Sequence, residues 1–155
     1  MKILAVGDLV GESGLIKLKK NLENLQTAEN IDFTIVNAEN VADGMGITTR
    51  DFNDLCKLNI DVITMGNHTW GKKDIFSFID DPKLIRPANY SKGVVGKGYT
   101  IIEKNGKKFL VINIIGRTDM GIQSDTPFTT VDDILKENKA DIPVVDFHAE
   151  ATAEK

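Results

Sequence analysis

The sequence predicts an α/β fold in which a mostly parallel central sheet is joined by an antiparallel hairpin. Three observations support this fold class. Short apolar runs alternate with amphipathic segments over residues 2–79, which is the pattern of parallel strands with crossover helices. Asn105-Gly106, a type I′ turn signal, separates two further apolar runs. A length of 155 residues suits one hydrophobic core, so we expect residues 1–155 to form a single layered domain.

Three strands are expected in the first half of the chain. Residues 2–7 form a short apolar run, and residues 32–37 and 61–65 form two more that are rich in β-branched side chains. Each run is five or six residues long, which is the usual length of a buried strand. Their order with the intervening helices is the β-α-β-α-β of a parallel sheet.

Helices are expected between and after these strands. Residues 48–51 have the form of a capping box and should open a helix that runs through Leu58. A further helix carrying Ile75–Ile79 should end before Pro82. The first helix is predicted by four leucines at helical spacing: Leu15, Leu18, Leu22 and Leu25.

The second half has a different pattern. Glycines punctuate a loop over residues 93–98, and Tyr99–Glu103 with Lys108–Ile115 should form the hairpin. After a polar loop, Thr130 should cap a short helix that carries two acidic residues in its first turn. Residues 142–147 predict a last strand that ends at His148.

Composition excludes several classes of function. A net charge of −4 provides no basic face for duplex nucleic acid, although a small nucleotide would not need one. Cys56 is the only cysteine, so we expect a small buried side chain there, with no intrachain disulfide and no thiolate metal cluster. No segment approaches the roughly 20 apolar residues of a membrane span. We therefore expect a cytoplasmic protein with no membrane partner, and a homo-oligomer remains possible.

Polar side chains follow four expected strands: Asp8, Glu39-Asn40, Asn67-His68 and His148. Singly, such residues are ordinary, because an Asp caps helices, a Glu is usually solvated, and a His is more often a structural hydrogen-bonding group than a ligand. The carboxyl ends of parallel strands meet at one edge of a sheet, so we expect these groups to converge. Carboxylate, amide and imidazole donors suit manganese, iron or zinc.

Two side chains have candidate chemical roles. Glu39 could bridge a pair of metals, which would make hydroxide available near neutral pH and neutralise charge on a phosphoryl group. His68 could deliver a proton to a leaving oxygen, because imidazole exchanges protons near neutral pH. Arg117 could clamp a phosphate, but pairing at the surface with Asp119 or Asp125 is the more common use of such a side chain.

The motifs together resemble the calcineurin-like metallophosphoesterases, and in particular the bacterial subgroup typified by the YmdB proteins. The resemblance covers essentially all 155 residues. Its motifs are Gly7-Asp8, Asn37-Ala38-Glu39-Asn40, Gly66-Asn67-His68-Thr69-Trp70, Arg86-Pro87-Ala88-Asn89, Gly116-Arg117-Thr118 and Asp146-Phe147-His148-Ala149-Glu150.

The resemblance implies a binuclear metal centre with Glu39 as the bridge and His68 as the general acid. It implies hydrolysis of phosphodiesters, with 2′,3′-cyclic nucleotides as the substrate class. Manganese or iron are the metals it favours, with zinc or magnesium possible. This chain and the subgroup both lack the first-strand histidine of the wider superfamily, and Asn40 is expected to take its place. The implied metal ligands are Asp8, Glu39, Asn40, Asn67 and His148.

Members of this family continue to a Gly-x-His-x-His element with two further ligands, whereas only His68 and His148 are present here. We therefore expect a fold that is incomplete at its C-terminus and that binds one metal weakly unless the remaining segment is supplied. Two alternatives stay open. One is a non-catalytic metal- or nucleotide-binding module that acts through a protein partner. The other is a flavodoxin-like binding domain without a metal.

Overall fold

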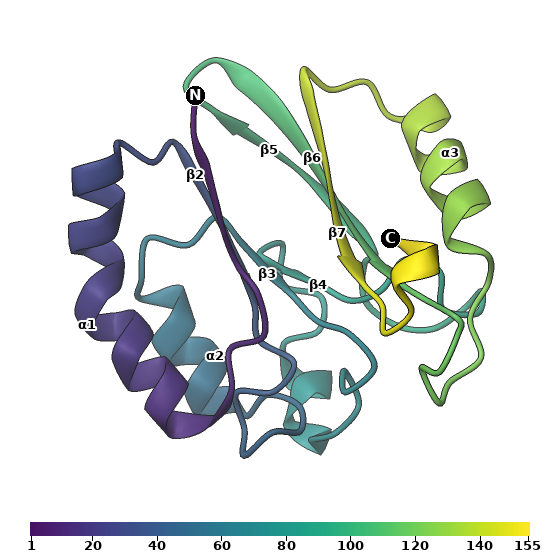
Figure 1. Ribbon diagram of the computed structural model, residues 1–155, viewed down its shortest axis with the longest axis horizontal. Coiled ribbons are helices and arrows are strands. Elements are labelled where there is room, and N and C mark those ends of the chain that lie inside the picture. The colour runs from purple at the N-terminus through teal and green to yellow at the C-terminus, as the bar shows by residue number, and fades with distance from the viewer. The chain divides into compact units, whose positions relative to one another are not determined.

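The structure is a computed structural model that describes residues 1–155 (Figure 1). The chain divides into two compact units, Met1–Phe78 and Ile79–Lys155, which we describe separately as unit 1 and unit 2. Unit 1 contains parallel strands with helices between them, and unit 2 contains a mixed sheet with one long helix. The predicted α/β class is confirmed. None of the helices combines the length and the apolar composition that a membrane span requires.

Unit 1 contains the three predicted parallel strands. β1 (Ile3–Val6) pairs with β2 (Phe33–Asn37), and β2 pairs with β3 (Val62–Thr64). Every residue of β2 and β3 is buried, which is typical of parallel strands covered on both faces. Because the three strands are parallel, the side chains that follow them leave the sheet at the same edge.

Helix α1 (Gly11–Glu29) connects β1 to β2 and is the amphipathic helix that the leucine spacing predicts. Leu15, Leu18 and Leu22 are buried, whereas Leu25 is 43% exposed. Asn30 ends the helix in the left-handed conformation, with φ of 53°.

Helix α2 (Thr49–Cys56) begins with the predicted capping box. The Thr48 hydroxyl accepts a hydrogen bond from the Asp51 backbone N–H, and the Asp51 carboxylate accepts one from the Thr48 backbone N–H. The helix ends at Cys56, two residues before Leu58, and Cys56 is half-buried rather than buried.

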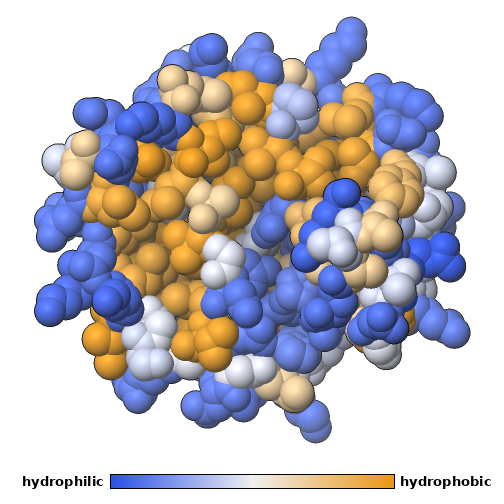
Figure 2. Space-filling view, in the orientation of Figure 1, coloured by the Kyte–Doolittle hydropathy of each residue, from blue (hydrophilic) through white to orange (hydrophobic).

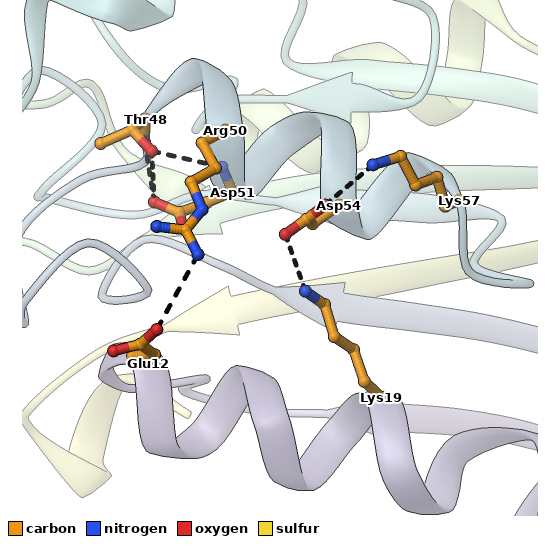
Figure 3. A network of polar contacts seen from close by, with 7 residues as sticks. All are labelled: Glu12, Lys19, Thr48, Arg50, Asp51, Asp54 and Lys57. Carbon is orange, nitrogen blue, oxygen red and sulfur yellow. Dashed lines mark hydrogen bonds and ion pairs between the residues drawn. The ribbon is translucent and has the colours of Figure 1, made fainter.

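Ion pairs connect α1 with α2 (Figure 3). Lys19 Nζ lies 2.7 Å from the Asp54 carboxylate, and Lys57 Nζ lies 3.0 Å from it. These two ammonium groups, Lys19 first, lower the pKa of Asp54 from 3.8 to about 2. Arg50 and Glu12 form a longer, exposed pair at 3.9 Å.

The helix predicted to carry residues 75–79 and to end just before Pro82 is wrong in type and extent. The chain forms only a short 3₁₀ helix, η1 (Lys73–Ser77), with Ile75 buried. Phe78 leaves the helical conformation and stacks on Phe52 of α2, with ring centroids 4.4 Å apart, so packing ends the helix early. Trp70 stacks on Phe76 at 5.6 Å.

Unit 2 begins with the two-residue strand β4 (Leu84–Ile85), followed by the predicted hairpin of β5 (Tyr99–Lys104) and β6 (Lys107–Ile115). Asn105 and Gly106 have φ of 54° and 71°, as a type I′ turn requires. The hairpin was expected to extend the parallel sheet. It instead forms a three-stranded sheet with β7 (Ile142–His148), which pairs in parallel with β6. The physical reason is the connection between β6 and β7, which contains a crossover helix and so returns the chain beside β6.

That crossover helix is α3 (Pro127–Glu137), and the short 3₁₀ helix η2 (Thr152–Glu154) follows β7. The prediction that Thr130 caps α3 was wrong, because Thr126 is the N-cap and Thr130 lies inside the first turn. No acidic residue lies in that turn. Pro127 at the first helical position sets the earlier start, since its fixed φ is already helical. One hydrophobic cluster of unit 2 contains buried residues of β6 and α3: Leu110, Ile112, Ile114 and Ile134.

Arg86 holds the glycine-rich loop of unit 2 in place. Its side chain is only 8% exposed, and its guanidinium donates hydrogen bonds to four backbone carbonyls, those of Pro87, Val94, Val95 and Gly96. Burial lowers the pKa of Arg86. The predicted loop over residues 93–98 is thus fixed by one buried cation.

Candidate functional site

Five of the predicted site residues lie where the strands of unit 1 end. Asp8 follows β1 by two residues, Glu39 and Asn40 follow β2, and Asn67 with His68 follows β3. Because the three strands are parallel, these residues leave the sheet at its carboxyl edge, as predicted. Unit 1 alone therefore positions two carboxylates, two amides and one imidazole.

Glu39 is fully buried, with an exposed fraction of 0%. Its carboxylate lies against Gly66, where an added Cβ would fall 2.6 Å from Cδ of Glu39. Its Oε2 also accepts a hydrogen bond from the His68 backbone N–H at 3.0 Å. Glu39 is therefore not a solvated surface group, and the absence of a side chain at Gly66 makes room for its carboxylate.

Asn40 connects Asp8 to His68. Its Nδ2 donates to Oδ1 of Asp8 at 2.6 Å, and its Oδ1 lies 2.5 Å from Nδ1 of His68. Since the amide oxygen can only accept, Nδ1 of His68 carries the proton in this contact. The other ring nitrogen, Nε2, is left for a substrate or a ligand. Asp8 reaches Asn40 from a left-handed backbone conformation, with φ of 50°.

The two remaining predicted residues lie in unit 2. His148 is the last residue of β7 and is half-buried, and its backbone carbonyl accepts a hydrogen bond from Gly116 at 2.8 Å. Arg117 is exposed. The expectation that His148 joins the donors of unit 1 stays a prediction, as does the phosphate contact of Arg117.

Sequence reasoning missed Glu154 and, although Gly66 was named in a motif, missed the role of Gly66 beside Glu39. Glu154 accepts hydrogen bonds from the backbone N–H groups of Arg117 and Thr118, at 3.0 and 2.9 Å, and so fixes the loop that carries Arg117. No pattern in the sequence marks this contact. Gly66 could have been recognised, because a glycine directly after a strand often permits a close approach.

The donor chemistry of unit 1 fits a divalent cation. Within either unit, no group of three or more His, Cys, Asp and Glu side chains is placed to hold a metal. A metal in unit 1 would therefore need the amide oxygens of Asn40 or Asn67 beside the carboxylates. Mixed carboxylate and amide donors suit manganese, magnesium and other cations that prefer oxygen ligands, and an imidazole extends the range to iron and zinc.

Comparison with known proteins gives consistent matches. A family model described as "YmdB-like protein" matches residues 4–155. The 2′,3′-cyclic-nucleotide 2′-phosphodiesterase of Bacillus subtilis (strain 168) is 47% identical over 158 residues, which cover 100% of this chain and 60% of that protein. This chain therefore spans less than two thirds of that relative's length.

Solved structures agree in fold. The crystal structure of a hypothetical protein from Thermus thermophilus is 35% identical and has a TM-score of 0.94, covering 100% of this chain and 60% of that one. An NAD nucleotidase of Haemophilus influenzae is 14% identical with a TM-score of 0.66, covering 97% of this chain and 38% of that one. The second likeness concerns the fold alone.

Proposed function

Because the chain belongs to the YmdB-like protein family, we propose that it carries the general acid and most of the metal ligands of a phosphodiesterase. The proposed substrates are small phosphodiesters, 2′,3′-cyclic nucleotides above all, in keeping with the name of the Bacillus subtilis relative. The observation that carries the proposal is the contact of Asn40 with both Asp8 and His68, next to the buried carboxylate of Glu39. The proposed compartment is the cytoplasm, since a lone cysteine forms no intrachain disulfide.

The proposed metal ligands are Asp8, Glu39, Asn40 and Asn67 of unit 1 and His148 of unit 2. Asn40 can serve its neighbours and a cation together, because an amide oxygen has two lone pairs and the contact with His68 uses one. When bound, two divalent cations would lower the pKa of a water molecule and offset charge on the phosphoryl group. Manganese and iron remain the proposed metals.

His68 is the proposed general acid. Its Nδ1–H donates to Asn40 whether the ring is charged or neutral, so Nε2 is the nitrogen that gains and loses the proton. Nε2–H would donate to the leaving ribose oxygen and transfer its proton as the phosphorus–oxygen bond breaks. The hydrogen bond from the His68 backbone to Glu39 holds the ring close to the proposed metal ligands.

A hydrolysis assay on the 155-residue chain tests the proposal. We expect weak Mn²⁺-dependent hydrolysis of bis-p-nitrophenyl phosphate and of 2′,3′-cyclic AMP by this chain alone, abolished by Glu39→Gln. Glu23→Gln, at an exposed position of α1, is the matched control and should leave the rate unchanged. Isothermal titration with Mn²⁺ on the same samples separates loss of metal from loss of chemistry. Hydrolysis that persists in Glu39→Gln would refute the assignment.

A non-catalytic metal-binding module is the second candidate. The observation in its favour is that the chain supplies only two imidazole groups, His68 and His148, and that His68 is the proposed acid. The same titration distinguishes the two, since a module would bind Mn²⁺ through Glu39 and hydrolyse neither substrate.

A further inference from the structure

Two aromatic side chains of unit 1 stack on each other and remain accessible to solvent. The ring centroids of Trp70 and Phe76 lie 5.6 Å apart, and the two ring planes are inclined by only 16°. Phe76 is 60% exposed, and Trp70 is half-buried. The pair therefore presents a flat apolar surface to water, which is a costly use of two large rings.

Other residues anchor this segment to the core. Ile75 of η1 is fully buried, with an exposed fraction of 0%. Phe78 stacks on Phe52 of α2, with ring centroids 4.4 Å apart. These contacts hold the segment against unit 1, so the exposed ring of Phe76 is not needed as an anchor.

Exposure alone does not identify a site. Figure 2 shows hydrophobic atoms at the surface around the position of β1 in Figure 1, and scattered apolar side chains are normal on protein surfaces. The stacked pair differs in its place along the chain. Trp70 follows His68 by two residues, so the Cα atoms of these residues are at most about 7 Å apart. The pair therefore lies close to the proposed general acid.

Backbone hydrogen bonds connect the surroundings of the pair to two residues of the proposed site. The Gly71 N–H donates to the His68 carbonyl at 2.9 Å, and the Gly46 N–H donates to the Glu39 carbonyl at 2.5 Å. Met45, which is 51% exposed, lies against Gly71, where an added Cβ would fall 2.6 Å from Cγ of Met45. Two segments that are bonded to proposed site residues thus meet beside the stacked pair.

A flat, uncharged and polarisable surface suits an aromatic heterocycle. A nucleotide carries such a ring one ribose away from its phosphate. Stacking of a base on an aromatic side chain tolerates every base, because every base has a π face. The thioether of Met45 can adapt to rings of different size. A surface of this kind selects for the presence of a base rather than for its identity.

We propose that Trp70 and Phe76 form a platform on which the base of the substrate nucleotide stacks, while the phosphate lies at the proposed metal ligands. We call this pair the base platform. The inference rests on the proposed function and adds to it the part of the substrate that determines specificity. Purine nucleotides should bind better than pyrimidine nucleotides, because the larger ring covers more of the platform.

Tryptophan fluorescence tests the platform without relying on hydrolysis. Trp70 is the only tryptophan, so its emission reports on this position alone. In the presence of Mn²⁺, 2′,3′-cyclic AMP should quench the emission and reach saturation, whereas ribose 2,3-cyclic phosphate, which has no base, should not quench it. Hydrolysis by this chain alone is expected to be weak, so each reading precedes consumption of the nucleotide.

Phe76→Ala removes one ring of the platform and should raise the half-saturating concentration of 2′,3′-cyclic AMP by about tenfold. Phe128→Ala is the matched control, because Phe128 is also 60% exposed but lies in unit 2. Its titration should match that of the unchanged chain. Both positions are exposed, so both variants should fold, and circular dichroism verifies this.

Hydrolysis rates test the same platform as a determinant of specificity. In Phe76→Ala, the ratio of kcat/KM for 2′,3′-cyclic AMP to kcat/KM for ribose 2,3-cyclic phosphate should fall by about tenfold, mainly through KM. Phe76→Tyr keeps an aromatic face and should retain the ratio. Phe128→Ala should also retain it.

The platform and the proposed hydrolysis can fail separately. Saturable quenching that Phe76→Ala weakens, without hydrolysis of either substrate, would support the platform as a nucleotide-binding surface and refute the proposed hydrolysis. Quenching that rises linearly without saturation, or that is equal in Phe76→Ala and the unchanged chain, would overturn the platform. A dimer of the chain that changes Trp70 emission by itself and dissociates in Phe76→Ala would also overturn it, because a second copy would then be the occupant.

Discussion

Gly66 determines where the Glu39 carboxylate can lie, and a single methyl group tests this. In Gly66→Ala the new Cβ would fall 2.6 Å from Cδ of Glu39, so the carboxylate must move. We expect the variant to lose about 1–3 kcal/mol of unfolding free energy and most of its affinity for Mn²⁺. Urea denaturation and isothermal titration measure the two effects. Gly7→Ala is the control, because a Cβ there meets nothing within 4 Å. Equal behaviour of the two variants would contradict the proposed placement.

We predict that the two histidines of the chain have different roles, His68 in turnover and His148 in metal binding. His68→Ala should lower turnover of 2′,3′-cyclic AMP by about 10²–10⁴-fold, because it removes the proposed acid, and should leave affinity for Mn²⁺ within about twofold. His148→Ala should weaken Mn²⁺ binding, because His148 is a proposed ligand. Hydrolysis rates and Mn²⁺ titrations on both variants measure the two roles separately. Loss of metal without loss of rate in His68→Ala would exclude the acid role.

For single residues, the sequence predicts which side-chain types lie at the strand ends but not the contacts that they make. Carboxylate, amide and imidazole side chains are expected at the ends of β1, β2 and β3, and they lie there. The hydrogen bonds from Asn40 to Asp8 and His68 could not be predicted, because they depend on side-chain rotamers and on the left-handed backbone of Asp8. The expectation that His148 joins them stays a prediction.

Among the secondary structure elements, those defined by local signals were predicted best. The capping box of α2 and the Asn105-Gly106 turn are complete within a few residues, so the sequence specifies them directly. η1 was predicted as a longer helix, because the stacking of Phe78 on Phe52 is a contact between residues 26 positions apart. The start of α3 was placed too late, although Pro127 is a local signal for it.

The link between α1 and α2 should weaken in acid. The pKa of Asp54 is about 2 in the folded chain, below its ordinary value of 3.8, so ionised Asp54 stabilises the fold above pH 3.8. That contribution is lost as the pH falls through about 2. We expect Asp54→Asn to lower the melting temperature at pH 7, with the difference from the unchanged chain shrinking below pH 4 and vanishing near pH 2.

Calorimetry across this pH range measures the difference in melting temperature between Asp54→Asn and the unchanged chain. Repeating it at high salt should give a smaller difference, because salt screens the ion pairs. Asp133→Asn is the control. The side chains of Asp133 and its partner Lys136 are 70% and 74% exposed, so their pair should contribute little at any pH. A pH-independent loss in Asp54→Asn would exclude the ion pairs as its cause.

The loop over residues 93–98 should depend on Arg86. Arg86→Lys keeps the charge but cannot donate to all four carbonyls, so it leaves buried acceptors without donors. We expect a loss of about 2–4 kcal/mol in urea denaturation. Arg50→Lys, at a guanidinium side chain that is 82% exposed, should cost almost nothing. A similar loss in both variants would argue against a specific role for Arg86.

For the whole molecule, the alternation of strands and helices was sufficient to predict the fold class. It was not sufficient to predict the division into Met1–Phe78 and Ile79–Lys155. Hydrophobic periodicity identifies which face of an element is buried, but it carries no information on which elements share a core. The grouping of the hairpin with β7 depends on the same missing information.

The prediction of one domain over residues 1–155 can be tested by the positions of the aromatic residues. Trp70 is the only tryptophan and lies in unit 1, whereas both tyrosines, Tyr90 and Tyr99, lie in unit 2. Each unit has fewer than 80 residues, a size at which one core supplies only about 3–5 kcal/mol. Units that stabilise each other should therefore unfold together. We expect tryptophan fluorescence and tyrosine second-derivative absorbance to give one urea midpoint. Two separate midpoints would mean that the chain folds as two domains, because each probe would then report its own transition.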